Sequence, residues 1–239
     1  MDQAAKYKYS EVTKLGSYRK TALMSRLFES HFPPLSENSK IVEIGPGRGE
    51  FAQECIRRKF DYTGIEPSET LADVLRSEGY NILSQKVPPL YLTNNDYDLI
   101  HSKDVIEHLK SYEEVLDLLA DCRLALRDGG YISAIVPNFA TLKELFYEYE
   151  YQHAYPTTEM RMQNLLEDSG FQVIKLRKVF CEIGLSKFCF LDRLLAHLLI
   201  PIARNSVFCA MVKMITSREI LFKIHKNVYD HIYVLGKKV

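Results

Sequence analysis

The sequence lacks the features that mark several common classes of protein. It has no excess of either charge, because its 31 basic and 31 acidic residues cancel, whereas a protein that binds nucleic acid over a wide surface is normally basic. Its five cysteines are an odd number and include no C-x-x-C pair, which argues against a disulfide framework or a zinc site. We therefore expect no nucleic-acid partner and a location in the reducing cytoplasm.

Long hydrophobic runs are also missing. No uninterrupted run reaches the roughly 18–20 residues that a membrane-spanning helix needs, and the first six residues lack the hydrophobic core of a signal peptide. Hydrophobic residues still make up 46% of the chain, enough for a sizeable core. Since single α/β domains commonly reach about 200–250 residues, the 239 residues predict one domain.

The most informative stretch is KIVEIGPGRGEF at residues 40–51, where a hydrophobic run leads into Gly45, Gly47 and Gly49. It predicts a strand, a tight turn and the start of a helix. Glycine allows positive φ and lets a ligand approach the backbone, and a helix N-terminus offers free N–H groups. A dinucleotide fingerprint would need glycine in place of Glu50, whose carboxylate would repel a pyrophosphate. The expected ligand is neutral or cationic there, and the alternative is a turn that binds nothing.

A second strand at residues 62–66 is expected to end in an acid, Glu66. The separation from Gly45 to Glu66 is about the 20 residues of one β-α-β unit. A carboxylate at a strand tip can accept charge-assisted hydrogen bonds from two ribose hydroxyls at once. The alternative is an ordinary surface acid before Pro67.

The remaining elements follow from hydrophobic periodicity and turn residues. The expected strands are at 80–84, from Asp98 onward, at 131–136, at 171–179 and at 231–239, with a turn at 128–130. Two helices are expected from their caps: one follows Ser68, and one follows Thr158 and carries Met160, Leu165 and Leu166. Two more are expected from a hydrophobic face: one with Phe51, Cys55, Ile56 and Phe60, and one at 112–126 with Val115, Leu116, Leu119 and Leu124.

Two motifs point to one family. E-I-G-P-G-R-G at residues 43–49 resembles the first motif of the class I S-adenosylmethionine-dependent methyltransferases. D-Y-D-L-I-H-S-K-D-V-I-E-H-L at residues 96–109 is similar to the fourth-strand motif of members that act on quinones, sugars and other small molecules. It lacks the N/D-P-P-Y/F sequence of amide and adenine N-methylating relatives. The resemblance covers roughly residues 40–180 and the last strand. It implies a Rossmann-like α/β fold with a seven-stranded, mostly parallel sheet, helices on both faces and an antiparallel last strand.

The resemblance also implies S-adenosyl-L-methionine as cofactor and a set of residues that bind it. The set is Glu43, Gly45, Pro46, Gly47, Gly49, Glu66, Pro67, Gln85, Lys103, Asp104 and Val105. Relatives usually place an acid after the third strand to contact the adenine amine, whereas this chain has Ser84-Gln85-Lys86. A carbonyl oxygen of Gln85, or a backbone group, would have to take that role.

Two histidines are candidates for catalysis, because imidazole titrates near neutrality and can take a hydroxyl proton. His108 is either a proton acceptor near the methyl group or a brace for the turn, and we favour the brace. His153 lies in an H-x-x-x-x-T…L-x-x-x-G-F run that resembles a subgroup common among bacterial polysaccharide and lipid-linked sugar methyltransferases. It is either the base or a loop histidine that fixes the turn. No cluster has clear metal-ligand spacing, so metal-independent transfer is predicted.

Four residues are expected to contact the acceptor: Asn138 at a strand mouth, Tyr155, and Tyr18 and Arg19 of the N-terminal segment, which could instead be a solvated lead-in. The single domain divides into an N-terminal helical cap (1–39), a cofactor-binding core (40–180), a helical insertion (184–227) and a last strand (228–239). The insertion carries seven basic residues against two acidic ones among its hydrophobic residues. It could pack on its own domain, lie on an anionic inner-membrane surface, form a homodimer face or form a lid over the acceptor.

Together these features predict O-methylation of a sugar or lipid-linked glycan intermediate. A quinone or other small-aromatic O-methyltransferase is the alternative within the enzyme class. A non-catalytic binding module of the same fold is the alternative outside it, since fold does not fix function.

Overall fold

The computed structural model describes Ser25, residues 28–179 and residues 231–239. Tyr18, Arg19, most of the expected N-terminal cap and the whole expected insertion at 184–227 lie outside the described residues. No helix within the described residues is both long and hydrophobic enough to cross a membrane.

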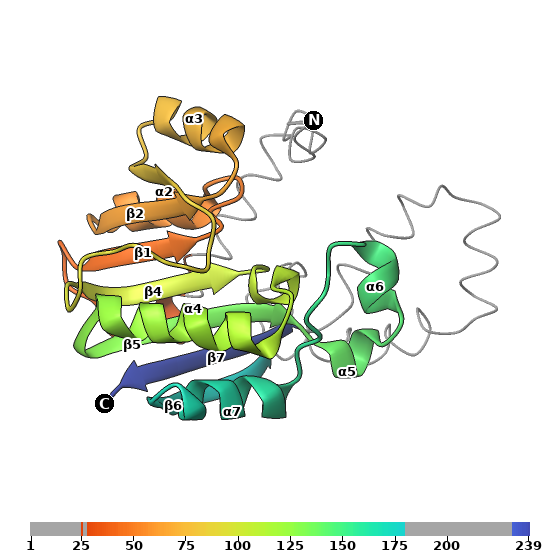
Figure 1. The fold of residues 1–239 in the computed structure, drawn as a ribbon. Coiled ribbons are helices and arrows are strands. Elements are labelled where there is room, and N and C mark those ends of the chain that lie inside the picture. Colours follow the sequence, from red (N-terminus) through yellow and green to blue (C-terminus); the bar gives the residue numbers. More distant parts are fainter. Residues whose placement is uncertain (1–24, 26–27, 180–230) are drawn as a thin grey trace.

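Seven strands form one sheet in the order β3-β2-β1-β4-β5-β7-β6 (Figure 1). Their bounds are β1 Lys40–Ile44, β2 Asp61–Glu66, β3 Ile82–Ser84, β4 Tyr97–Lys103, β5 Leu126–Pro137, β6 Phe171–Val179 and β7 His231–Lys238. Strands β1 to β5 pair in parallel, and β7 is antiparallel to both β5 and β6. This confirms the predicted Rossmann-like sheet and its reversed last strand. The strand order switches direction between β1 and β4, which is where ligands bind in open α/β sheets.

Helices cover both faces of the sheet, as predicted. They are α2 Glu50–Arg57, α3 Glu69–Ser77, the 3₁₀ helix η2 Ile106–His108, α4 Tyr112–Ala125, α5 Phe139–Leu142, α6 Leu145–Tyr149 and α7 Glu159–Asp168. Helices α4 and α7 pack on one face in one hydrophobic cluster, while α2 and α3 contribute to the cluster on the other. Figure 1 shows α5 and α6 beyond the carboxyl ends of β4 and β5.

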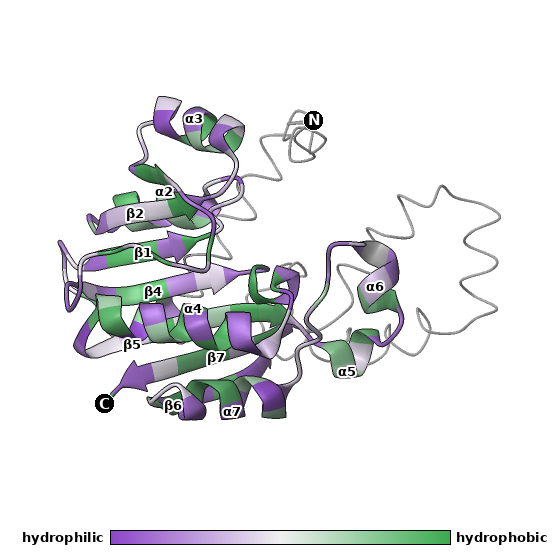
Figure 2. Ribbon diagram, viewed as in Figure 1, coloured by the Kyte–Doolittle hydropathy of each residue, from purple (hydrophilic) through white to green (hydrophobic). Residues whose placement is uncertain are grey.

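The sequence pattern explains how α4 docks on the sheet. Val115, Leu118, Leu119 and Cys122 are buried and lie at i, i+3, i+4 and i+7, which is one helical face. In Figure 2 the middle of strands β1, β4, β5 and β7 is hydrophobic, and α4 and α7 alternate hydrophobic with hydrophilic residues. Burial of each such side chain contributes about 1.5–3 kcal/mol to the stability of the fold. Because helices pack in this way on both faces, the ends of the strands are held in fixed positions.

The structure corrects several expected helix faces. Ile56 and Leu124 were placed on buried faces, but their side chains are 52% and 56% exposed. Met160 is also exposed, and Phe60 lies beyond the end of α2, although its ring remains buried in the same cluster. Ile56, Leu124 and Met160 lie within α2, α4 and α7 but on the solvent side of each helix, whereas α2 ends at Arg57, before Phe60.

Two strand starts differ from the prediction by two residues or more. Strand β3 begins at Ile82 and not at residue 80, and β5 begins at Leu126 directly after α4. The expected turn at 128–130 is therefore part of β5, where Gly129 has φ of +74°. Leu126 pairs with Tyr97, and the register shifts before Leu99 pairs with Tyr131, so the glycines are absorbed as an irregularity in the ladder.

Candidate cofactor and acceptor site

The glycine turn between β1 and α2 is built from three residues of positive φ. Gly45, Gly47 and Gly49 have φ of +74°, +54° and +76°. The Gly45 N–H donates to the Ile65 carbonyl at 2.9 Å, which ties the turn to β2. The Gly49 N–H donates to the Pro46 carbonyl at 2.8 Å, and Gly49 is the N-cap of α2. The predicted strand, turn and helix start are confirmed.

The glycines differ in what a side chain would meet. A Cβ on Gly45 would lie 2.7 Å from Cγ2 of Val105, so this glycine is needed for packing against the residue before η2. A Cβ on Gly49 would lie 3.1 Å from Cδ2 of Leu75. Among the residues that the structure describes, no atom lies within 4 Å of a Cβ on Gly47, and Gly47 is exposed. The turn is therefore open to a ligand at Gly47, with buried Pro46 beneath it.

Glu66 lies at the carboxyl end of β2, next to the glycine turn. Its side chain is only 6% exposed, and Oε1 accepts a hydrogen bond from the Ser68 N–H at 2.9 Å. This bond fixes the carboxylate just as the chain leaves the strand, while Pro67 points outward and is exposed. A fixed, charged acceptor at a strand tip suits a ligand with hydroxyl groups.

Glu43 on β1 is a second buried acid close to the turn. Its side chain is 4% exposed, and its Oε2 accepts a hydrogen bond from the Tyr62 hydroxyl at 2.7 Å. Burial raises the pKa of Glu43 to about 8, while the Tyr62 hydrogen bond and the positive charge of Lys103 act in the opposite direction. Glu43 is thus mostly protonated at neutral pH in this structure, and a cation arriving at the turn would favour its ionised form.

Gln85 connects the ends of β2 and β3. Its N–H donates to the Glu66 carbonyl at 3.1 Å, and its Nε2 donates to the Pro89 carbonyl at 2.8 Å. The second bond orients the amide and leaves Oε1, the atom that a contact to an adenine amine would require, outside that interaction. The contact of Gln85 with an adenine amine stays a prediction.

The chain turns sharply where β4 ends, as predicted. Asp104 has φ of +54°, unusual for a residue other than glycine, and its N–H donates to the Ile135 carbonyl at 2.9 Å. Its carboxylate lies 3.3 Å from Nζ of Lys103 and 3.6 Å from Nε2 of His231 on β7. Lys103, Asp104 and Val105 are all half-buried at the carboxyl edge of the sheet.

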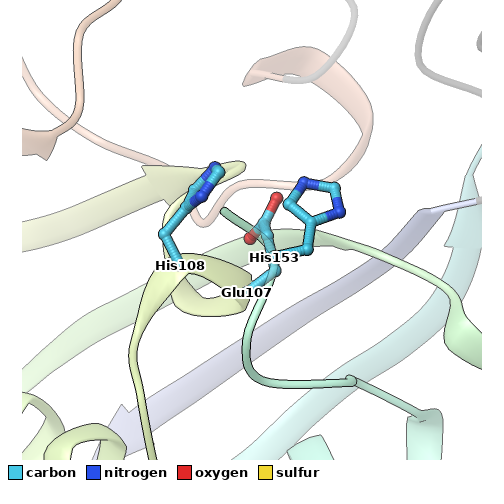
Figure 3. Close-up of side chains that lie close together, drawn as sticks. All are labelled: Glu107, His108 and His153. Atoms are coloured by element: carbon cyan, nitrogen blue, oxygen red, sulfur yellow. The ribbon is translucent and has the colours of Figure 1, made fainter. Parts of the chain in front are cut away.

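Three side chains from two distant segments meet beyond that edge. Glu107, His108 and His153 each place a possible ligand atom within 4.8 Å of the others (Figure 3). Figure 3 shows the Glu107 carboxylate between the two imidazole rings. The rings of His108 and His153 lie 5.0 Å apart, and the Glu107 carbonyl accepts hydrogen bonds from the N–H groups of Ala154 (2.8 Å) and Tyr155 (3.0 Å). Sequence spacing gave no sign of this cluster, because that backbone link joins segments more than 40 residues apart.

His153 is held in one orientation. Its Nδ1 lies 2.7 Å from the Phe146 carbonyl of α6, and its ring also packs against the Phe146 ring. Burial lowers the pKa of His153 below its ordinary value, so the ring is neutral near pH 7. A carbonyl oxygen can only accept, so Nδ1 carries the proton and Nε2 carries the lone pair. This contact supports the predicted role in fixing the loop and also prepares Nε2 for chemistry, while His108 is exposed.

Two expected acceptor contacts are occupied by internal roles. Asn138 is 1% exposed, and its side chain caps α5 by accepting from the Ala140 N–H at 3.1 Å and donating to the Thr141 hydroxyl at 3.1 Å. The Tyr155 ring is buried in the core, with the Arg161 guanidinium 4.3 Å above it. Neither side chain is carried into the proposed acceptor site. A strand-mouth asparagine is also a good helix N-cap, which the sequence alone could not separate from a substrate contact.

The strand order and the glycine turn define a Rossmann-like α/β domain. A sequence profile described as a methyltransferase domain matches residues 15–176, so the chain belongs to this family of methyltransferase domains. That assignment makes the protein an enzyme that transfers methyl groups, with S-adenosylmethionine as the cofactor that it implies. No curated protein sequence matches the chain.

Solved structures share the fold at low sequence identity. An S-adenosylmethionine-dependent methyltransferase from Archaeoglobus fulgidus aligns over 92% of this chain and 94% of its own, with 21% identity and a TM-score of 0.63. Phosphoethanolamine N-methyltransferase 2 of Haemonchus contortus, in complex with phosphomonomethylethanolamine and S-adenosylhomocysteine, has 16% identity over 96% of this chain and 58% of its own, with a TM-score of 0.62. Geranyl diphosphate C-methyltransferase from Streptomyces coelicolor has 11% identity, covers 92% and 79%, and has a TM-score of 0.61.

Proposed function

We propose that the protein transfers a methyl group from S-adenosylmethionine to a hydroxyl oxygen of a sugar or lipid-linked glycan intermediate. The observation that carries the cofactor part is the open turn at Gly47, beside a fixed carboxylate at the next strand tip, Glu66. No atom of the described part of the chain lies within 4 Å of a Cβ added to Gly47. An open turn next to a strand-tip acid fits a nucleoside with a free diol.

Several residues at the carboxyl edge of the sheet would hold the cofactor, each at a different part of it. Glu66 would accept from the ribose hydroxyls, and the backbone around Gly47 would lie along the amino-acid part. Glu43 lies close enough to the turn to be ionised by an arriving ammonium group, since neighbouring charges already act on its pKa. Gln85 would offer Oε1 to the adenine amine. When bound, the cofactor supplies a sulfonium methyl group that an acceptor lone pair attacks as the carbon–sulfur bond breaks and its electrons stay on sulfur.

The chain's part in the chemical step is alignment and help with the loss of one proton. Correct alignment alone can lower the barrier by about 7–11 kcal/mol. A hydroxyl acceptor must also lose its proton when the new bond forms. Nε2 of His153 is the lone-pair nitrogen that the Phe146 contact leaves for this role.

The acceptor class rests on sequence and not on the fold. The run from His153 to Phe171 resembles polysaccharide-biosynthesis methyltransferases, and the cationic hydrophobic segment at 184–227 would suit a lipid-linked acceptor at a membrane surface. The structurally similar proteins methylate nitrogen in one case and carbon in another, so the fold does not choose the acceptor atom. A homodimer through 184–227 is the alternative use of that segment.

A calorimetric titration with S-adenosylhomocysteine tests the cofactor part. We expect the wild-type chain to bind, and Glu66→Gln to weaken binding by about tenfold or more, because two charge-assisted hydrogen bonds become neutral ones. Glu78→Gln is the matched control, because Glu78 is exposed at the far end of α3. Absence of binding by the wild-type chain would leave only a binding module of the same fold, without this cofactor.

Mass spectrometry of a cell extract incubated with an isotopically labelled methyl donor tests the acceptor part. The expected labelled product is a glycan or a lipid-linked sugar carrying the label on oxygen. His153→Ala should lose turnover and keep its affinity for S-adenosylhomocysteine. Label found on a quinone or another small aromatic compound would contradict the glycan assignment while leaving methyl transfer intact.

A further inference from the structure

The cluster of Glu107, His108 and His153 has the composition of a transition-metal site. Two imidazoles and one carboxylate are ligands that zinc and related divalent ions accept, whereas magnesium prefers oxygen ligands alone. Bond lengths of about 2.0–2.2 Å put ligand atoms roughly 3–4 Å apart in an occupied site. The three ligand atoms here lie within 4.8 Å of one another, so they would have to draw closer together on binding an ion.

Two features of the structure hold the three side chains together without an ion. The Phe146 carbonyl fixes Nδ1 of His153 as the protonated nitrogen, which is the support that metal-binding histidines normally receive from a carbonyl or carboxylate. The second preparation is the backbone link from the Glu107 carbonyl to the N–H groups of Ala154 and Tyr155. It holds the segment that carries Glu107 and His108 against the loop that carries His153, so the three side chains converge without a ligand.

The position of the cluster relates it to the cofactor turn. Val105, the residue before η2, is the residue that a Cβ on Gly45 would touch at 2.7 Å. Glu107 and His108 follow two and three residues later within η2. The cluster therefore lies close to the glycine turn at the carboxyl edge of the sheet.

We propose that Glu107, His108 and His153 bind one divalent transition-metal ion, with Zn²⁺ as the best fit, and that the ion holds the acceptor oxygen. This inference rests on the proposed function and replaces the role of His153 as a base, because its Nε2 would bind the ion. Three protein ligands leave a coordination position open for a substrate oxygen, and a bound ion lowers the pKa of that hydroxyl. The oxygen keeps its electron pair for the new bond to the methyl carbon, and the proton passes to water.

Titration of the full chain with ZnCl₂ tests the site directly. The protein is freed of any affinity tag and treated with a chelator, and binding is followed by calorimetry. We expect one equivalent to bind, and the visible absorption of added Co²⁺ should show nitrogen and oxygen ligands in a low-coordinate site. MgCl₂ should bind far more weakly. Removing one ligand in His108→Asn or His153→Gln should weaken Zn²⁺ binding by about tenfold or more.

Controls separate loss of the site from loss of the fold. His108→Asn changes an exposed side chain, so its circular dichroism and its affinity for S-adenosylhomocysteine should match the wild type. Gln152→Ala alters the exposed neighbour of His153 and should bind Zn²⁺ normally. Equal Zn²⁺ affinity in the wild type, His108→Asn and His153→Gln would overturn the proposal, as would no binding to the wild type.

The two proposals fail in different ways. If S-adenosylhomocysteine binds to the chelator-treated protein and no ion does, the metal site is wrong and methyl transfer stands with His153 as a simple base. If the ion binds and S-adenosylhomocysteine does not, the cofactor assignment is wrong and the ion has another purpose.

Discussion

Replacing Glu43 by glutamine should change how stability depends on pH. The Glu43 carboxyl is fully buried in β1, and burial raises its pKa from about 4.5 to about 8. Glutamine has nearly the same shape and can accept the same hydrogen bond from the Tyr62 hydroxyl, which lies 2.7 Å from Oε2. The substitution therefore removes the ionisable group and keeps the packing.

The sign and size of the effect follow from the two pKa values. Between about pH 4.5 and about pH 8 the folded chain keeps the Glu43 proton while the unfolded chain releases it, so the wild type loses stability as pH rises. The loss is about 1.4 kcal/mol per pH unit and on the order of 5 kcal/mol over the whole interval. The contribution is fully present below the unfolded pKa and is gone above the folded one, whereas Glu43→Gln has no such dependence.

Urea unfolding of both proteins between about pH 5 and about pH 8 measures the effect. The free energy of unfolding of Glu43→Gln minus that of the wild type should increase steadily over this interval and then level off. Glu148→Gln, which alters an exposed residue of α6, is the control and should show a constant difference. A difference that stays constant for Glu43→Gln would mean that Glu43 is already ionised in the folded protein, and the reasoning would be wrong.

Two further substitutions test the turn and a helix cap. Gly45→Ala should lower the free energy of unfolding by about 1–3 kcal/mol, because φ is +74° and the new Cβ would lie 2.7 Å from Cγ2 of Val105. Urea unfolding measures this change. An unchanged midpoint would show that the turn relaxes freely. Thr158→Ala should lower the free energy of unfolding by about 1 kcal/mol, because it removes the side-chain acceptor of the Arg161 N–H. Thr158→Ser should stay close to the wild type. Equal melting temperatures for the wild type and both variants would exclude a role for the cap.

Much of the fold could be predicted because its signals are local. The hydrophobic run and glycines at 40–49 define a strand and a turn within a dozen residues, and β2, β4 and α7 follow from similarly short patterns. Thr158 was correctly placed as an N-cap, since that geometry depends on only three neighbours. The β-α-β spacing then brings Glu66 to the same edge as Gly47.

The rest of the site depends on contacts between distant segments, which no short pattern contains. The Glu107 link to residues 154 and 155 creates the cluster with His153, and the Tyr62 hydroxyl makes Glu43 a buried, hydrogen-bonded acid. Asn138 was predicted to contact the acceptor, and in the structure its side chain caps α5. A polar residue at the end of a strand gives the same sequence signal whether it binds a ligand or caps the next helix. Such choices are decided by tertiary packing.

Binding of S-adenosylhomocysteine to Gly47→Val, compared with Gly79→Val, tests the central claim most directly. Both glycines have positive φ, +54° and +92°, so both substitutions strain the backbone. Within the described residues neither has an atom within 4 Å of an added Cβ, so neither substitution adds a clash at Cβ. Gly47 lies in the open turn beside Glu66, whereas Gly79 follows α3 at the entrance to β3. We predict that calorimetry shows binding to the wild type and to Gly79→Val and none to Gly47→Val. Undiminished binding to Gly47→Val would contradict the placement of the cofactor at this turn.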